Sequence, residues 1–410
     1  MANERVMAIV GAGHVGGRAA QALREAGWQG KIVLIGAEAH LPYERPPLSK
    51  GVLTGEHDAA KCLLQSPDVW RQAGVEHVVA TVEGIDTSGR EVRLHDGRAI
   101  SYAALLIATG GHARRLTIPG ADDDWVFTLR TLDDAVSLAP RLAPGARIVV
   151  IGGGFIGLEV ASSARARGCE VIVVEGASRL LVRAVPAPIA ARVQALHERN
   201  GVRIATGAVP HAIERRPDGA LAVLMEHGEV LLADTVVVGV GIDPADELAR
   251  AAGLEVDRGI IVDGGLETSA SGVFAAGDVA VFPGPVSGQR IRQETWHNAQ
   301  TQAGVAARNM LGAREVYREI PWFWSDQYDH QIQVAGEPAV GVQSVTRSLA
   351  GDADICFYID SGDRIVGASG FGRVSSLAKE MKLARTLVDR GALVGTADLG
   401  DPGVKLKSLL

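Results

Sequence analysis

The stretch Val10-Gly-Ala-Gly-His-Val-Gly16 returns later in the chain as Ile151-Gly-Gly-Gly-Phe-Ile-Gly157. In both, an apolar run ends in glycines with the spacing Gly-x-Gly-x-x-Gly, and a helical pattern follows. The first glycine permits a tight turn, the second lets the backbone approach a pyrophosphate, and the third lets helix and strand pack closely. Two copies at long separation predict two dinucleotide-binding folds and not a solenoid.

Each glycine motif lies inside a predicted strand–helix–strand unit. The first unit comprises residues 6–10, 15–26 and 31–35, and the second comprises residues 147–151, 155–167 and 170–174. Further apolar strands at 103–107, 235–240 and 273–276 end in Thr109-Gly110, Gly241 and Gly277-Asp278. We interpret the segments after the first two of these strands as the places where the chain crosses between the two folds.

The pattern predicts an α/β protein, and 410 residues are too many for one compact core. We expect one Rossmann-like domain from residues 1–114 and 242–320, and a second from residues 115–241. Residues 321–410 differ in character, because aromatic residues precede alternating strand-like segments and a basic helix near residues 379–390. This segment predicts a smaller C-terminal α+β domain.

The composition excludes several classes of protein. The net charge of −7 disfavours nucleic acid as the main partner, and no apolar stretch reaches the roughly 18 residues that span a bilayer. Cys62, Cys169 and Cys356 lie far apart, which argues against a disulfide framework and a cysteine-based metal site. The first residues show no secretion signal. We therefore expect a cytoplasmic protein that uses no metal and binds neither nucleic acid nor membrane.

An acidic residue about 20 positions after a glycine motif can bind a ribose 2′-hydroxyl and repel a 2′-phosphate. Glu175 stands at that position after the second motif and favours NADH over NADPH, although Arg179 and Arg183 follow nearby. After the first motif the matching residue is Gly36, and Glu38 follows two residues later. Glu38 either binds a ribose from a displaced loop or is a plain surface carboxylate.

The strand that ends in Gly277-Asp278 predicts a carboxylate at the carboxyl end of a sheet, beside the first glycine loop. Such an aspartate can accept a hydrogen bond from a ribityl hydroxyl. Standing alone, the segment is more typical of a turn aspartate.

The order of these motifs resembles that of the two-dinucleotide flavoprotein superfamily. A closer resemblance is to the oxygenase-coupled ferredoxin reductases, the reductase components of bacterial aromatic-ring dioxygenases and haem monooxygenases. It is carried by Pro42-Tyr-Glu-Arg-Pro-Pro-Leu-Ser-Lys50, Ile156-Gly-Leu-Glu159, Glu294-Thr-Trp296 and Pro321-Trp-Phe-Trp-Ser-Asp326. The resemblance implies glutathione-reductase-like domains for FAD and NAD, with FAD and NADH as cofactors.

The resemblance also implies which residues contact each cofactor. Those implied for FAD are Gly11, Gly13, His14, Val15, Gly16, Glu38, Arg45, Lys50, Thr109, Gly110, Arg130, Gly277, Asp278, Glu294, Thr295, Trp296 and Trp324. Those implied for NADH are Gly152, Gly154, Phe155, Ile156, Gly157, Glu175, Arg183 and Gly241. Among the FAD residues, Arg45 and Lys50 match positions against the isoalloxazine, Asp278 matches the ribityl-binding aspartate, and Trp296 matches a residue at the pyrimidine edge.

Lys50, Glu159 and Trp324 match the catalytic positions of the family. A reduced flavin is negatively charged, so a nearby ammonium lowers the cost of accepting a hydride. A buried lysine needs an acid beside it, and the resemblance supplies Glu159 as that acid. Without the resemblance, Lys50 is more simply a surface lysine and Trp324 a core aromatic residue.

The chain lacks the redox cysteines that disulfide reductases of this superfamily place beside the flavin. The resemblance therefore implies an NADH:ferredoxin oxidoreductase that passes a hydride from NADH to flavin N5 and single electrons to a two-iron two-sulfur ferredoxin. An aromatic-ring dioxygenase is the favoured recipient system. The alternatives are an NADH oxidase, a rubredoxin reductase, a nitrite-reductase subunit, or a redox-responsive binding protein resembling apoptosis-inducing factor.

An acidic ferredoxin needs a basic patch on this net-acidic chain. The candidate cations are Arg308, Arg314, Lys379, Lys382, Arg385, Lys405 and Lys407. Each of these is also explained as a solvated surface residue. The sequence leaves the oligomeric state open between a monomer and a weak dimer.

Overall fold

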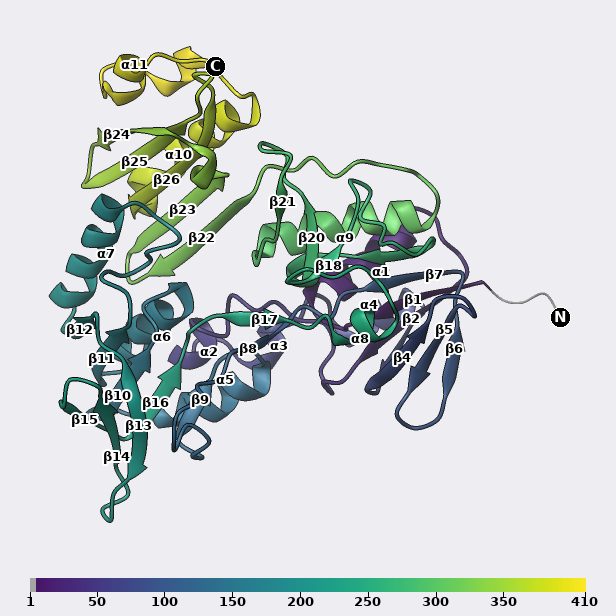
Figure 1. Cartoon of the computed structure of the whole chain (residues 1–410), viewed down its shortest axis with the longest axis horizontal. Coiled ribbons are helices and arrows are strands. Elements are labelled where there is room, and N and C mark those ends of the chain that lie inside the picture. Colours follow the sequence, from purple (N-terminus) through teal and green to yellow (C-terminus); the bar gives the residue numbers. More distant parts are fainter. Residues whose placement is uncertain (1–4) are drawn as a thin grey trace. The chain divides into compact units, whose positions relative to one another are not determined.

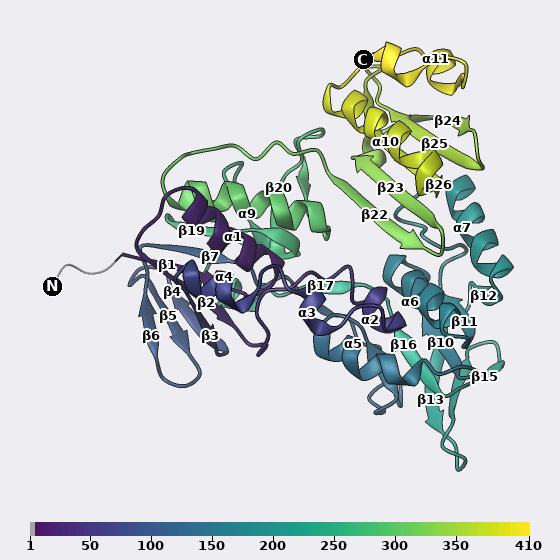
Figure 2. The same ribbon diagram turned by 180° about the vertical axis from the view of Figure 1, so that it is seen from behind.

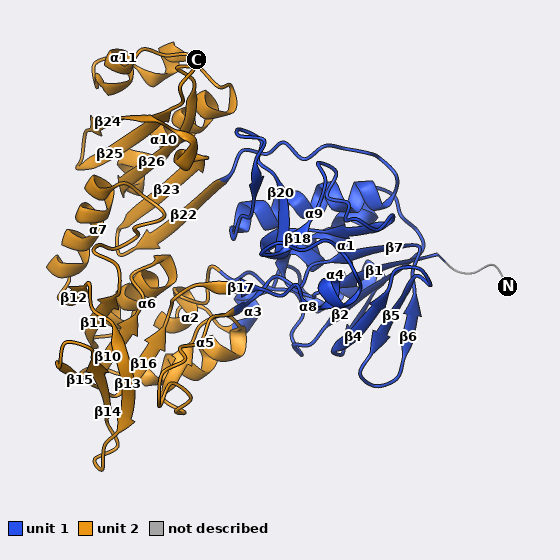
Figure 3. Cartoon of the chain, in the orientation of Figure 1, with its two compact units in different colours: residues 1–45, 59–112, 243–321 blue, residues 46–58, 113–242, 322–410 orange. Residues whose placement is uncertain are grey.

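The computed structural model describes residues 5–410, which form two compact units (Figure 3). Unit 1 consists of residues 5–45, 59–112 and 243–321. Unit 2 consists of residues 46–58, 113–242 and 322–410. Three of the points where the chain changes unit, after residues 112, 242 and 321, lie beside the predicted domain boundaries at 114, 241 and 320. The assignment of these domains to FAD, NAD and a C-terminal module stays a prediction.

Unit 1 is built around a five-stranded parallel sheet with the order β19-β7-β1-β2-β3 (Figure 1). Its strands are β1 (Val6–Val10), β2 (Lys31–Gly36), β3 (Val75–Val79), β7 (Ala104–Ile107) and β19 (Val273–Ala275). The inner strands are continuous apolar runs because helices cover such a sheet. Helices α1 (His14–Glu25) and α9 (Trp296–Met310) pack against each other, and α9 also contacts β7 and β19.

Smaller elements complete unit 1. Its other helices are α3 (Ala59–Cys62), α4 (Pro67–Gln72) and α8 (Glu247–Ala251). An antiparallel sheet contains β4 (Val82–Asp86), β5 (Glu91–Leu94) and β6 (Ala99–Ser101). A third sheet contains β18 (Ile260–Ile261), β20 (Ala280–Pro283) and β21 (Arg290–Ile291). The strands β8 (Gly111–Ala113) and β17 (Ile242–Pro244) lie where the chain changes unit.

Unit 2 contains a second five-stranded parallel sheet, with the order β12-β11-β10-β16-β9. Its strands are β9 (Val126–Thr128), β10 (Arg147–Ile151), β11 (Glu170–Glu175), β12 (Val202–Thr206) and β16 (Thr235–Val238). The accompanying helices are α2 (Gly51–Thr54), α5 (Leu132–Leu138), α6 (Phe155–Ala166) and α7 (Ala187–Arg199). An antiparallel sheet of β13 (Pro210–Arg215), β14 (Leu221–Met225) and β15 (Val230–Ala233) extends this part.

The C-terminal part of unit 2 is an antiparallel sheet with the order β22-β23-β26-β25-β24. Its strands are β22 (Trp322–Gln327), β23 (His330–Gly336), β24 (Gln343–Leu349), β25 (Ala353–Ile359) and β26 (Ile365–Arg373). Helix α10 (Val374–Asp389) packs on β23, β25 and β26, and α11 (Thr396–Gly400) packs on β24 (Figure 2). Helix α6 contacts the edge strand β22, and α7 contacts β26.

The predicted fold class is confirmed: two Rossmann-like parallel sheets and a smaller α+β segment are present. Helix α10 begins at Val374, earlier than the basic stretch that suggested it. Its first turns include Leu377 and Met381, which are buried on the face that packs against the sheet. The predicted start of this helix was therefore too late, because its first turn carries no basic residue.

Candidate functional site

The first glycine loop connects β1 to α1 in unit 1. Gly11 has a φ of +111°, and a β-carbon there would collide with the Ala108 carbonyl group on the neighbouring strand β7. A β-carbon on Gly16 would collide with the Gly11 carbonyl oxygen, so the helix can begin this close to the strand only at a glycine. At Gly13 an added β-carbon would meet only the Arg45 side chain, at 3.8 Å. The space in front of the helix N-terminus is therefore open to a phosphate.

His14 is buried directly behind this loop. Its Nε2 lies 2.9 Å from Gln300 Oε1, so Nε2 carries the hydrogen and Nδ1 is left as an acceptor. Within residues 5–410, Nδ1 has no hydrogen-bond partner. Burial lowers the pKa of His14 below its ordinary value. The ring contacts the indole of Trp296 edge to face at 5.3 Å, and Trp296 Nε1 donates to Glu44 Oε1 at 3.1 Å.

The turn Gly277-Asp278 lies against α1, as its sequence position suggested. A β-carbon on Gly277 would collide with the Val15 side chain. The Gly277 amide donates to Oε1 of the fully buried Gln302 at 2.7 Å, and Gln302 Nε2 has no partner within the described residues. Buried polar atoms without a partner are rare, and two of them lie behind this loop among the described residues.

Arg45 and Glu38 lie together at the same loop. Arg45 Nη2 is 3.4 Å from Glu38 Oε1, and the Tyr43 hydroxyl donates to Glu38 Oε2 at 2.6 Å. Glu38 is thus held by two partners and is not a plain surface carboxylate. The guanidinium of Arg45 lies beside Gly13, at the phosphate end of the predicted site.

The remaining predicted FAD residues are placed in both units. In unit 1, the Thr109 hydroxyl donates to the Ala245 carbonyl oxygen at 2.7 Å, and Glu294 is exposed and pairs with Arg292 at 2.8 Å. Thr295 caps the N-terminus of α9 by accepting from the Asn298 amide. In unit 2, the Arg130 amide donates to Asp134 at the start of α5.

The second glycine loop connects β10 to α6 in unit 2 and repeats the first. Gly152 has a φ of +115°, and a β-carbon on Gly157 would collide with the Gly152 carbonyl oxygen. A β-carbon on Gly154 would meet nothing within 4 Å, so this loop is also open in front of the helix. In the first turn of α6, Ile156 is exposed and Phe155 contacts Phe323 edge to face at 5.0 Å.

Glu175 ends β11 with its carboxylate turned toward this loop. Its Oε2 accepts from the Gly153 amide at 2.7 Å, and its Oε1 accepts from the Ala177 amide at 2.7 Å. Arg179 donates to the carbonyl oxygens of Leu180 and Val182, and Arg183 is exposed. Two of the hydrogen-bond donors of Arg179 are therefore used by backbone carbonyl oxygens.

Gly241 ends the segment after β16. It has a φ of +110°, and its carbonyl oxygen accepts from the Arg114 amide at 2.9 Å. This hydrogen bond holds the backbone just after β16 in place.

Lys50 and Glu159 form an ion pair inside unit 2. The carboxylate of Glu159 is 4% exposed, and Lys50 Nζ lies 3.1 Å from Oε1. The Ser325 hydroxyl donates to the same oxygen at 2.6 Å, and the Ser49 hydroxyl donates to Oε2 at 2.5 Å. A buried carboxylate needs this degree of satisfaction. The predicted pair is present, and the two serines are partners that the sequence did not reveal.

Trp324 lies on β22, next to this pair. Its indole stacks on Trp322 with ring centres 5.1 Å apart, and Arg385 of α10 lies over Trp322 at 5.2 Å. Trp324 Nε1 donates to Asp326 Oδ2 at 3.0 Å, and the same oxygen lies 3.8 Å from Lys50 Nζ. The predicted catalytic residues Lys50, Glu159 and Trp324 are therefore joined through Asp326.

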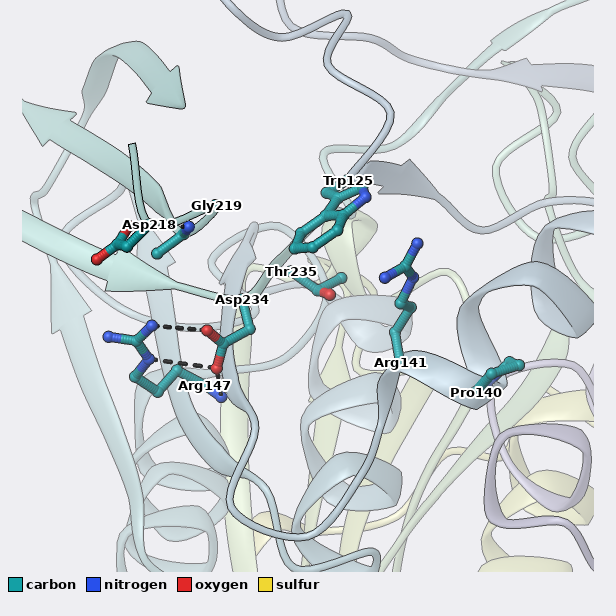
Figure 4. A pocket seen from close by; sticks show the side chains of 9 residues that line it. Trp125, Pro140, Arg141, Arg147, Asp218, Gly219, Asp234 and Thr235 are labelled. Atoms are coloured by element: carbon teal, nitrogen blue, oxygen red, sulfur yellow. Dashed lines mark hydrogen bonds and ion pairs between the residues drawn. The ribbon is translucent and has the colours of Figure 1, made fainter. Parts of the chain in front are cut away.

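An open pocket of about 460 Å³ lies elsewhere on unit 2 (Figure 4). Trp125 and Arg141 face each other on one side, and Arg147 is paired with Asp234 on the other. Arg147 and Thr235 are the first residues of β10 and β16. The pocket thus lies at the amino ends of the strands, whereas α/β sheets bind nucleotides at the carboxyl ends. It is not part of the nucleotide site.

Residues 5–303 match the family described as Pyridine nucleotide-disulphide oxidoreductase, and residues 322–410 match the Reductase C-terminal family. The chain belongs to the pyridine nucleotide-disulphide oxidoreductase family. It is an oxidoreductase of the FAD- and NAD(H)-dependent type, and its sheets, loops and open cradles fit both cofactors. In residues 5–410, no disulfide joins the three cysteines, and no group of side chains could hold a metal ion.

Named relatives cover the whole chain. The ferredoxin--NAD(+) reductase component of the anthranilate 1,2-dioxygenase system of Burkholderia cepacia is 41% identical over 98% of each chain. A crystal structure of a ferredoxin reductase from Rhodopseudomonas palustris is 36% identical, with a TM-score of 0.93 over 98% of this chain and 99% of that one. A putidaredoxin reductase–putidaredoxin complex gives 35% identity and a TM-score of 0.93, covering 100% of this chain and 98% of that one.

Proposed function

We propose that this chain is an NADH:ferredoxin oxidoreductase that supplies electrons to an aromatic-ring dioxygenase. The observation that carries the proposal is the combination of two open glycine loops with an ion pair between Lys50 and the buried Glu159, and with no disulfide among the described residues. The described residues hold no disulfide that could act as a thiol relay, and in this proposal the flavin gives its electrons directly to the ferredoxin. The similarity to the reductase of the anthranilate dioxygenase system supports the dioxygenase as recipient.

In this proposal, unit 1 holds the pyrophosphate and ribityl parts of FAD. Gly13 gives access to the N-terminus of α1. The resemblance implied a place against the isoalloxazine for Arg45, but its guanidinium lies beside Gly13, and we therefore propose that it pairs with a phosphate. Glu38 accepts from an adenosine ribose hydroxyl, since a carboxylate retains free lone pairs after accepting from Tyr43 and Arg45. Asp278 accepts from a ribityl hydroxyl.

Unit 2 holds NADH over the loop at Gly154. Glu175 accepts from the ribose 2′-hydroxyl while its carboxylate stays fixed by the Gly153 and Ala177 amides. A 2′-phosphate would bring a charge of about −1.5 to −2 beside this carboxylate. The proposal therefore predicts a preference for NADH.

FAD, when bound, accepts a hydride from NADH and releases electrons singly. Lys50 then provides a fixed positive charge that offsets the negative charge of the reduced ring. Glu159 keeps that ammonium in place, and the hydroxyls of Ser49 and Ser325 keep Glu159 in place. Trp324 would lie on the route by which electrons leave the bound flavin.

We further propose that the partner is an acidic two-iron two-sulfur ferredoxin that docks on α10. Lys379, Lys382 and Arg385 recur every three residues along this helix, and the two lysines are exposed. Arg308, another candidate from the sequence, is paired with Glu315 and so is neutralised. The position of Arg385 over Trp322 connects the basic stripe to the tryptophan pair.

We also propose that the protein works in the cytoplasm, where NADH is available, as a monomer or weak dimer. Its three cysteines are buried and unlinked in the described part of the chain, which suits a reducing compartment. Over the same residues, no helix is long and apolar enough to cross a membrane.

The test is NADH-driven reduction of a two-iron two-sulfur ferredoxin by the purified yellow protein. Changing Lys379→Glu with Lys382→Glu should slow ferredoxin reduction about tenfold at low salt, while bleaching of the flavin by NADH is unchanged. The matched control is Arg71→Glu with Arg98→Glu, which alters charge equally at exposed positions of unit 1. Wild-type oxygen consumption as fast as ferredoxin reduction would instead identify an NADH oxidase.

A further inference from the structure

A ladder of hydrogen bonds crosses the edge of the C-terminal sheet and ends at Asp326. Trp322 Nε1 donates to Gln333 Oε1 at 3.4 Å, and Gln333 Nε2 donates to Gln331 Oε1 at 2.5 Å. Gln331 Nε2 then donates to Asp326 Oδ1 at 2.7 Å, and Trp324 Nε1 donates to Asp326 Oδ2 at 3.0 Å. Both indole N–H groups of the stacked pair are thus tied to one carboxylate, directly or through two amides.

The geometry of β22 and β23 accounts for this ladder. Trp322, Trp324 and Asp326 alternate along β22 and share one face of the sheet. Gln333 lies directly opposite Trp324, and Gln331 lies directly opposite Asp326. Cross-strand neighbours at this distance can exchange side-chain hydrogen bonds. The alternation brings two indoles, two amides and one acid into a single polar row.

Asp326 also reaches the charged pair. Its Oδ2, which accepts from the Trp324 indole, lies 3.8 Å from Lys50 Nζ. Lys50 in turn lies 3.1 Å from Glu159, so one ammonium is placed between two carboxylates. Glu159 is almost fully buried, whereas the Asp326 side chain is 39% exposed. Asp326 is therefore the outward-facing member of the cluster and the one that connects the ammonium to the tryptophan pair.

We propose that Asp326 is a positioning residue for electron output: its carboxylate fixes the ring of Trp324, and through it the Trp322–Trp324 stack, relative to Lys50. The proposal rests on the proposed function, in which Trp324 lies on the route from flavin to ferredoxin. Each step on that route moves one electron from the reduced flavin to the oxidised iron–sulfur cluster. Its rate depends on the distance and orientation of the groups between them, while delivery of the hydride by NADH does not use Trp324.

The experiment compares Asp326→Leu, which removes both acceptor oxygens at similar size, with Asp326→Asn, which keeps one carbonyl oxygen for the indole. Asp329→Asn is the control, because Asp329 lies on the same hairpin and contacts His330 and Arg373 outside the cluster. The first readout is the far-ultraviolet exciton couplet of the stacked indoles, assigned with Trp322→Phe. The second is anaerobic kinetics, with flavin reduction by NADH and ferredoxin reduction measured as separate steps.

Asp326→Leu should lose the couplet and lower kcat for ferredoxin about tenfold, with KM for ferredoxin unchanged and the rate of flavin reduction changed much less than kcat. Asp326→Asn should restore the couplet and most of kcat, and Asp329→Asn should match the wild type. An intact couplet in Asp326→Leu, or an equal loss in both kinetic steps, would overturn the proposal. A wild-type flavin that NADH does not bleach would refute the proposed function instead, and the couplet would still test the role of Asp326.

Discussion

The two glycine loops share one backbone geometry but differ at two positions: the middle residue of the loop and the last residue of the next strand. In the second loop, the middle residue is Gly153, and Glu175 at the end of β11 fills the space beside it, accepting from its amide at 2.7 Å. In the first loop, the middle residue is Ala12, and Gly36 ends β2. A β-carbon on Gly36 would come within 2.5 Å of the Ala12 β-carbon. In the first loop only one of the two positions can carry a side chain, whereas in the second loop a β-carbon on Gly153 would lie 3.1 Å from Glu175 and 2.5 Å from Leu180.

This difference shows that the middle residue of the glycine loop partly determines where the following acidic residue can stand. Where Ala12 fills the space, the acid moves two residues on to Glu38 and is held by Tyr43 and Arg45. Where Gly153 leaves the space empty, the acid stands at the strand end. We infer that the two loops bind riboses from different directions and therefore hold different dinucleotides.

The largest expected effect comes from blocking each loop in turn, because each variant should lose a different cofactor. At Gly13 and Gly154 the backbone is extended and an added β-carbon meets no clash, so we expect the fold to accept valine at either position. The new side chain would, however, occupy the place of a phosphate. Gly13→Val should yield a folded, colourless protein. Gly154→Val should yield a yellow protein that NADH bleaches about a hundredfold more slowly at low NADH.

Visible absorption and anaerobic NADH titration check this pair, and circular dichroism confirms that each variant is folded. If Gly13→Val retains FAD, or if Gly154→Val is bleached as readily as the wild type, the assignment of the loops is wrong. A reversed result would mean that the two cofactors are exchanged.

A smaller effect, on the affinity for NADH, is expected when a side chain is added at Gly153. In Gly153→Ala, the β-carbon would lie 2.5 Å from Leu180 and 3.1 Å from Glu175, so the carboxylate must move. Loss of one charged hydrogen bond to the ribose should weaken NADH binding about tenfold. Fluorescence titration of the nucleotide measures this, with Ala12→Gly as the matched change in the first loop. Unchanged affinity in Gly153→Ala would show that Glu175 does not contact the ribose.

The smallest effect is on the pH dependence of stability and concerns His14. The matching residue in the second loop is Phe155. Burial lowers the pKa of His14 in the folded protein, while the unfolded chain keeps the ordinary value of 6.5. Below about pH 6.5 the unfolded state therefore takes up a proton that the folded state does not, and stability falls as the pH falls. His14→Phe should unfold with a weaker dependence on pH between about 6.5 and 5. Thermal unfolding of both proteins across this range is the check, and parallel curves would contradict it.

The sequence predicted the elements that local pattern determines. Both strand–helix–strand units follow from glycine spacing and apolar runs, and the pair of Lys50 and Glu159 follows from family resemblance. The hydroxyls that satisfy Glu159 could not be predicted, because Ser49 and Ser325 lie 110 and 166 residues away along the chain. Their approach depends on how α6, β22 and the segment before α2 pack together.

The same limit applies to the first loop. Gln302 supports the Gly277 amide from α9, yet a glutamine in an amphipathic helix carries no local sign of that role. Ala12 and Gly36 are individually unremarkable, and their mutual exclusion appears only once β1 and β2 lie side by side. A single sequence therefore does not reveal the contacts between residues that lie far apart along the chain.

The most direct test of the two-loop account is a single-turnover experiment without oxygen. The yellow protein is mixed with one equivalent of NADH, and oxidised two-iron two-sulfur ferredoxin is added afterwards. The account predicts that NADH bleaches the flavin, that the reduced flavin persists until ferredoxin is added, and that two ferredoxins are reduced per flavin as the yellow colour returns. A flavin that NADH leaves oxidised, or a reduced flavin that ferredoxin does not reoxidise, would contradict it.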